Sequence, residues 1–344
     1  MSCSNPKPLR LFLMSAPACL ASMQTLACAT CGCTLSADAA MGYSAVSGWR
    51  FTLEDDYIDQ DQLRGGTSTA TPSQVVNNPS NPALGGGEIE KQTVNRYLIL
   101  GINYSPDLNW NLNLLMPYVD RDHTTYGTQL APYTPAESAP EQVSSAHVSG
   151  LGDIKLIGSY QGLLPARNLG VQLGVKLPTG DYGTRVVFNS GPGIGTPLDA
   201  SLQAGTGSTD LIVGAYYHQP VSENFTAFVN GQFQSAIEHH MNEPGDDYRP
   251  GNTTTVSMGV RYERTPRWLP QLQLNFSHKS ADQGALADTT DTAGTVVYAS
   301  PGVIVSVLQH LQLFGFVQLP VYSRLDGYQL FPHWTASVGA SYAP

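Results

Sequence analysis

Residues 169–177 read Leu169-Gly-Val-Gln-Leu-Gly-Val-Lys-Leu177, in which apolar residues alternate with glycine or polar residues. A period of two is the repeat of a β-strand, because successive side chains point to opposite faces of a sheet. The segment 225–234 alternates in the same way, with Phe225, Val229 and Phe233 on one face. Both stretches predict strands that have an apolar side and a polar, glycine-rich side.

The same alternation recurs along the chain, and a helical period is nowhere sustained. We place strands at 45–57, 91–105, 108–120, 150–162, 167–178, 208–219, 223–238, 252–264, 268–280, 294–308, 310–322 and 330–342. Long connections follow the odd-numbered strands up to the ninth, and tight turns such as Ser105-Pro106-Asp107 follow the even-numbered ones. This sorting is typical of outer-membrane barrels. We therefore predict an all-β fold, a transmembrane antiparallel β-barrel of about 12 strands in up-and-down order with both termini in the periplasm.

Aromatic residues stand beside the tight turns, where a girdle at the periplasmic interface of the outer membrane would lie. They are Tyr104, Trp110, Tyr160, Tyr217, Phe225, Tyr262 and Trp268, with Tyr342 near the carboxyl end. Lipid offers no hydrogen-bond partner for backbone groups, so a spanning sheet cannot leave an open edge. The pattern therefore predicts a closed barrel.

The composition of the 344 residues agrees with this fold class. Charged residues make up only 13%, and the formal net charge of −10 argues against a nucleic-acid partner, which needs clustered Lys and Arg. A mean hydropathy of −0.15 excludes a bundle of transmembrane helices.

The amino end has the features of an export signal. Lys7 and Arg10 precede a short apolar stretch, and Ala27-Cys28-Ala29 forms a small-x-small cleavage site. We predict a signal peptide at 1–29, a Cys-containing periplasmic segment at 30–44 and the barrel at 45–344. The predicted location is the outer membrane of a Gram-negative bacterium.

Cys28, Cys31 and Cys33 lie close together, and no cysteine follows them. Three thiolates within six residues could bind a soft metal ion such as Cu(I) or Zn(II). Lipidation of Cys28, a local disulfide and a metal-free contact within the lumen are the alternatives. A c-type haem is the least favoured alternative, because Gly32 stands where such a site needs histidine.

Three glycine-aspartate motifs carry a family resemblance. They are Gly150-Leu-Gly-Asp153-Ile-Lys155, Leu177-Pro-Thr-Gly-Asp181 and Gly205-Thr-Gly-Ser-Thr-Asp210. Together they resemble the outer-membrane channel family labelled for the meta-pathway of phenol degradation, over about residues 90–342. The resemblance implies an outer-membrane barrel that acts as a transporter, and it implies no particular substrate.

Strand parity collects charged residues of both signs on the lumen face: Arg50, Glu54, Asp153, Lys155, Lys176, Asp210, His218 and Arg261. They could line a polar conduit for a small solute. Alternatively, they could interlock as salt bridges and leave no continuous pore. Gly170, Gly174, Gly214, Gly259 and Gly339 share this face, and the missing side chains favour an open cavity.

Two other groups of residues could carry chemistry. His278-Lys-Ser280 resembles the His-x-Ser pair of outer membrane phospholipase A, but Ala281-Asp282 replaces the Asn-Gly that follows in that family. Residues 238–247 concentrate His and acidic side chains, which could bind a divalent cation through N and O ligands. Because these ligands lack a fixed spacing, we interpret the segment as a solvated acidic loop. We predict that the protein is not an enzyme.

These observations lead to one main hypothesis and two alternatives. The main hypothesis is a passive channel or transporter for a small aromatic or hydrophobic solute, in contact with outer-membrane lipid and lipopolysaccharide. The first alternative is a non-conducting binding or structural barrel whose Cys cluster binds a soft metal or a periplasmic redox partner. The second is a phospholipase that uses His278 and Ser280.

Overall fold

The computed structural model describes residues 26–27, 33–34, 47–76, 89–126, 143–183 and 186–344. Within them, a short pair of strands, β1 (Leu26–Ala27) and β2 (Cys33–Thr34), precedes a large antiparallel sheet. The predicted signal peptide and most of the predicted Cys-containing segment lie outside the described residues.

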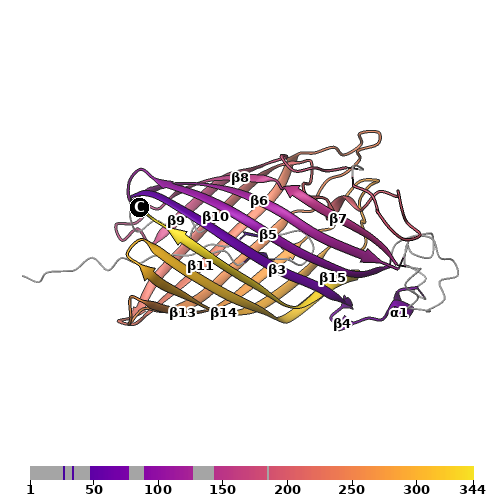
Figure 1. Ribbon diagram of the computed structural model, residues 1–344. Helices are drawn as coiled ribbons and strands as arrows, with labels where there is room; N and C mark the ends of the chain where they lie inside the picture. Colours follow the sequence, from indigo (N-terminus) through magenta and orange to yellow (C-terminus); the bar gives the residue numbers. More distant parts are fainter. Residues whose placement is uncertain (1–25, 28–32, 35–46, 77–88, 127–142, 184–185) are drawn as a thin grey trace, which may run out of the picture.

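The large sheet closes on itself as a barrel with tilted strands (Figure 1). Its members in chain order are β3 (Gly48–Gly66), β4 (Ser68–Thr69), β5 (Glu90–Ser105), β6 (Trp110–Thr125), β7 (Ser144–Leu151), β8 (Ile154–Tyr160), β9 (Leu169–Leu177), β10 (Thr209–Ser222), β11 (Phe225–Glu238), β12 (Thr253–Tyr262), β13 (Trp268–Lys279), β14 (Gly294–Leu308) and β15 (Leu311–Tyr342). Eleven of these strands form the closed ring, in which β15 pairs with β3, while β4 and β7 lie off it. The predicted closed, up-and-down barrel is confirmed.

The strand β15 crosses the barrel twice. Its residues 311–325 pair with β14, and its residues 325–342 pair with β3. Leu311 and Tyr342 therefore lie at one end of the barrel and Leu325 at the other. The chain reverses at Gly327, whose positive φ of 61° suits a residue without Cβ. Because β7 and β8 both pair with β6 and share one crossing, the wall contains the twelve crossings that the sequence predicts.

Several strands extend further than predicted. β3 continues to Gly66 and β6 to Thr125, whereas the sequence pattern placed their ends at 57 and 120. β7 begins at Ser144 instead of 150. These extensions project beyond the apolar band, where both faces carry polar residues and alternation no longer marks a strand.

The two ends of the barrel differ. Tight turns and the C-terminus lie at one end, which we call the turn end, and β4 and the short helix α1 (Pro72–Val76) lie at the opposite loop end (Figure 1). No helix in the described part of the chain is long and apolar enough to span a membrane.

The outer face is apolar and bears aromatic residues at both ends. Leu98, Leu173 and Leu272 are exposed on it, as expected for contact with lipid. At the turn end, Trp49 packs on Tyr104, Trp110 on Tyr160, and Phe225 on Tyr262, with ring centroids 4.5, 4.7 and 5.1 Å apart. Tyr57 and Trp334 form a similar pair nearer the loop end, 5.8 Å apart. The predicted girdle at the tight turns is present.

Candidate functional site

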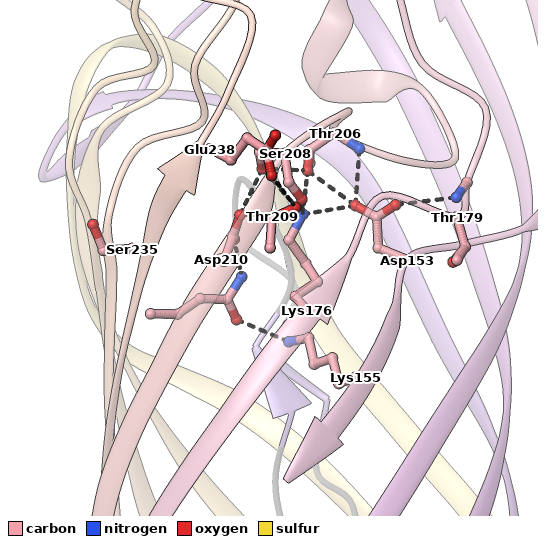
Figure 2. Close-up of polar contacts among 12 residues, drawn as sticks. Asp153, Lys155, Lys176, Thr179, Thr206, Ser208, Thr209, Asp210, Ser235 and Glu238 are labelled. Carbon is pink, nitrogen blue, oxygen red and sulfur yellow. Dashed lines mark hydrogen bonds and ion pairs between the residues drawn. The ribbon is translucent and has the colours of Figure 1, made fainter.

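A buried ion-pair network lies on the lumen side of β8, β9 and β10, near the loop end. Lys176 Nζ is 2.8 Å from Asp153 Oδ2 and 3.4 Å from Asp210 Oδ1, and these three side chains are at most 8% exposed. The same ammonium group donates to Thr206 Oγ1 and to the Ser208 carbonyl oxygen, the latter at 2.9 Å. Figure 2 shows Lys176 at the centre of these groups. The buried lysine charge is therefore balanced by two carboxylates.

The network continues to a second lysine. Asp210 Oδ2 accepts a hydrogen bond from Gln234 Nε2 at 2.6 Å, and Gln234 Oε1 accepts one from Lys155 Nζ at 3.0 Å. Asp153 also accepts from the Thr206 backbone N–H at 3.0 Å. Four of the predicted lumen residues are thus brought together, and here the interlocked arrangement is the one observed.

The glycine-aspartate motifs converge on this network. Asp153 Oδ1 accepts from the backbone N–H of Gly180 at 3.1 Å, and Thr179 Oγ1 donates to the Gly152 carbonyl at 2.8 Å. A Cβ on Gly180 would lie 2.7 Å from Gly205 Cα, so the two backbones can approach only as glycines. The motifs are therefore explained by one structural junction between strand ends.

The other predicted lumen residues lie elsewhere along the barrel. Glu54 is buried, as is its neighbour Asp56, which accepts a hydrogen bond from Ser337. Arg261 is buried near the turn end and pairs with Glu263 at 2.7 Å. Arg50 and His218 are half-buried, also toward the turn end. The eight residues therefore do not form one continuous charged path.

Part of the connection between β9 and β10 folds into the barrel, and we call residues 186–207 the inward loop. Phe188, Leu198 and Leu202 are buried in it and pack against Ala146 and Val148 of β7. The loop contains a single turn of 3-10 helix, η4 (Ala200–Leu202), in which Ala200 and Leu202 are buried. The sequence placed this stretch among the long connections and did not indicate that it folds inward.

Arg121 of β6 holds the inward loop in place. Its guanidinium donates to the carbonyl oxygens of Leu202 and Gln203 and, at 2.7 Å, to the Tyr97 hydroxyl. Arg121 was missed because the predicted strand ended one residue before it. Arg121 and His123 are buried on the lumen face together with Val119, but residues 120–125 are polar at every position, so the sequence offered no alternation that would have extended the strand.

Two cavities lie on either side of this loop. The loop-end cavity, of about 540 Å³, is lined by residues of α1, the inward loop and the segment 285–292. The inner cavity, of about 150 Å³, is lined by Tyr97, Ile99 and Leu115 of the wall and by Gln203, Ala204 and Thr206 of the inward loop. Ser201 lines both cavities, so η4 separates them.

The glycines of the lumen face do not create open space, contrary to the sequence-based expectation. Tyr216 covers Gly170, and Phe228 and Phe314 cover Gly259 and Gly339: a Cβ on these glycines would lie 2.1, 2.8 and 2.3 Å from the respective ring. Gly174 is covered by Ile157, and Gly214 by Gln172 and Gln232. The missing side chains instead allow neighbouring side chains to lie flat on the wall, as aromatic residues do over glycines in sheets.

The remaining candidate residues do not assemble into a second site. Cys28 and Cys31 lie outside the described residues, and Cys33 pairs with Ala27 in the short sheet, so the metal hypothesis stays a prediction. His278 Nδ1 is 2.9 Å from Thr295 Oγ1, and Ser280 Oγ accepts from the Asn252 N–H, so neither side chain engages the other.

Two groups of possible metal ligands lie on the loops and the outer face of the barrel. In the loop 238–247, His240 Nδ1 pairs with Glu243 Oε2 at 2.8 Å. Within the described part of the chain, three possible ligands meet only at Asp120, Asp122 and His147. These side chains alternate with buried Arg121 and His123 and therefore point away from the lumen.

A closed antiparallel barrel with an apolar outer face and a polar lumen defines an outer-membrane β-barrel protein of the Gram-negative type. The chain belongs to the family described as "Putative MetA-pathway of phenol degradation", whose sequence pattern matches residues 101–330. No curated protein matches the sequence significantly.

Solved structures support the fold. An outer membrane channel from Pseudomonas putida F1 is similar with a TM-score of 0.60 at 12% identity, covering 88% of this chain and 98% of that one. The toluene transporter TbuX from Ralstonia pickettii has a TM-score of 0.44 at 10% identity, covering 87% of this chain and 90% of its own. A FadL homologue from Pseudomonas aeruginosa has a TM-score of 0.42 at 12% identity, covering 89% and 92%. The first likeness confirms the barrel fold, and the other two are too distant to add to it.

Proposed function

We propose that the protein is a passive outer-membrane channel for a small aromatic or hydrophobic solute, with its loop end outside the cell and both termini in the periplasm. The observation that carries this proposal is the pair of cavities inside a closed barrel, both of which border η4 of the inward loop. Long loops on the outside and short turns in the periplasm are the usual orientation of such barrels.

The lining of the loop-end cavity suits an apolar solute. Leu63, Val75, Ile89 and Leu330 form a buried cluster along one side of it, and Leu198 and Leu202 of the inward loop line it as well. Polar and acidic residues, among them Glu90 and Asp199, line the rest of the cavity, so an apolar surface faces a polar one. A weakly polar ring would be desolvated there at little cost.

Planar-bilayer recording of the full-length protein tests the proposal. We expect steady unitary currents without any energy source, and a reversible reduction of the current when benzyl alcohol is added as an aromatic probe. A matched variant in which residues 188–202 are replaced by Gly-Ser-Gly-Ser should conduct more and be less sensitive to benzyl alcohol. Absence of current from the wild type would overturn the proposal and favour the non-conducting barrel.

A further inference from the structure

The inner cavity has the size of a single aromatic ring. Its volume is about 150 Å³. A cavity of about that volume lined by Leu, Ile and Phe binds benzene, whereas sites for drug-sized ligands are several times larger. Ile99, Leu115 and Val119 give it an apolar floor, and each is 3% exposed.

The charges that surround this floor are mainly positive. Arg121, Lys155, Lys176 and Lys279 line the cavity, together with Asp153 and Asp210. Lys176 lies between the two aspartates, and Lys279 Nζ is 2.8 Å from Asp282 Oδ1. Lys176 and Lys279 are thus balanced by carboxylates of the wall and the neighbouring loop.

Arg121 differs from these lysines because its hydrogen-bond acceptors are all neutral. They are Asn95 Oδ1 at 2.5 Å, the Tyr97 hydroxyl at 2.7 Å, and the carbonyl oxygens of Leu202 and Gln203, the last at 3.3 Å. The side chain is only 5% exposed. A buried cation with only neutral acceptors is stabilised when an anion lies beside it.

We propose that the inner cavity binds a single-ring carboxylate, with the ring on Ile99, Leu115 and Val119 and the carboxylate on the Arg121 side. This proposal deepens the channel function and rests on it for the solute's route into the lumen. It assigns a solute class to the inner cavity alone, because the loop-end cavity has four acidic side chains and no Lys, Arg or His in its lining.

Isothermal titration calorimetry of the full-length protein in detergent tests the site with four probes. We expect benzoate to bind about tenfold or more tightly than benzyl alcohol, the ratio expected for one hydrogen bond to a charged group. Benzylamine should bind least, because its ammonium group opposes the cationic rim. Naphthoate should bind more weakly than benzoate, because two rings exceed the cavity.

Three variants make the result specific. Leu115→Phe fills the floor while keeping every charge, and it should weaken benzoate binding about tenfold or more. Arg121→Gln should bring the preference for benzoate over benzyl alcohol close to one. Arg96→Gln, on the outer face where Arg96 pairs with Asp55, should change neither value.

Each outcome decides the proposal. No benzoate binding by the wild type, unchanged binding in Leu115→Phe, or a preference that survives Arg121→Gln would overturn it. Leu115→Phe retains Arg121, so it tests the site even if Arg121→Gln loosens the inward loop. Binding is measured without current, so benzoate binding by a protein that conducts nothing would refute the channel and leave the site standing. Conduction without benzoate binding would refute the site and leave the channel standing.

Discussion

The loop-end cavity and the inner cavity are adjacent spaces in one barrel, yet their linings carry opposite charge. Glu90, Asp199, Asp288 and Asp291 are the charged residues of the loop-end cavity. The inner cavity has four cationic side chains and two acidic ones. Charge is therefore sorted by depth along the barrel axis, and the inward loop separates the two environments.

The origin of this difference is the kind of element that supplies each charge. Asp199, Asp288 and Asp291 come from the connections between strands, whereas Arg121, Lys155 and Lys176 stand on strands that form the wall. The three loop carboxylates are half-buried, whereas Arg121 and Lys176 of the wall are buried and are hydrogen-bonded to fixed acceptors. We therefore expect the loop charges to act on solutes that approach the barrel and the wall charges to act on solutes held in the inner cavity.

The largest expected effect comes from removing the part of the inward loop that lies between the two cavities. Replacing residues 188–202 by Gly-Ser-Gly-Ser removes η4 and merges the two cavities. We expect the single-channel conductance to increase several-fold, because the inward loop forms the separation between them. Planar-bilayer recording measures the change.

A shortened loop that lines neither cavity is the control for this deletion. Removing residues 242–246 from the connection between β11 and β12 should leave the conductance close to that of the wild type. Equal increases from both deletions would show that the inward loop is not the constriction.

The second effect concerns the stability of the wall of the inner cavity. Lys176→Met leaves Asp153 and Asp210 buried without their shared cation, and we expect a loss of roughly 3–5 kcal/mol in the free energy of unfolding. Urea denaturation followed by gel mobility of the folded barrel measures it. Adding Asp153→Asn to Lys176→Met should restore part of the loss, and a Lys176→Met protein as stable as the wild type would contradict the ion-pair assignment.

The third effect concerns ion selectivity. Arg121→Gln removes one positive charge from the inner cavity, so the reversal potential in a salt gradient should shift toward greater cation preference. Arg96→Gln removes the same charge from the outer face and should leave the reversal potential unchanged. Equal shifts in the two variants would mean that the inner cavity does not control the current.

The sequence was sufficient to predict the barrel, the side of the wall on which strand residues lie, and the aromatic girdle. Strict alternation, as in Leu169–Leu177, placed Val171 and Leu173 on the lipid side and Lys176 on the lumen side. Tight turns flanked by aromatic residues predicted the girdle that Trp49, Tyr104 and Trp110 form. These features depend on nearest neighbours along one strand, and the sequence contains them directly.

The division between the cavities could not be predicted in the same way. Arg121 lies in a part of β6 where both faces are polar, so alternation did not mark it as a wall residue. Its partners Leu202 and Gln203 lie 81 and 82 residues away, in a loop whose inward path depends on packing of Phe188 and Leu198 against β7. Such long-range contacts leave no periodic signal.

The smallest expected effect comes from the pH-dependent ionisation of Asp291 in the loop-end cavity. Burial and the neighbouring Asp288 carboxylate raise the pKa of Asp291 from 3.8 to about 6. A pKa raised by folding means that the folded loop prefers the protonated acid, so its stabilising contribution is complete below pH 4 and is lost as the pH rises through about 6. Amide hydrogen exchange in residues 281–293, corrected for intrinsic rates, should therefore be slower at pH 5 than at pH 7.5.

Two variants separate the causes of this pH dependence. Asp291→Asn cannot ionise and should make protection of the loop independent of pH, with protection at pH 7.5 rising to the level seen at pH 5. Asp288→Asn removes the neighbouring charge but not the burial, so the transition should remain and move to lower pH, because burial is the larger cause.

In bilayers, the cation preference of the wild type should rise between pH 5 and 7.5 as this fourth acid of the loop-end cavity ionises, and Asp291→Asn should abolish most of that rise. A pH-independent wild type would mean that Asp291 is already ionised at pH 5 and that the four acids act as a fixed charge.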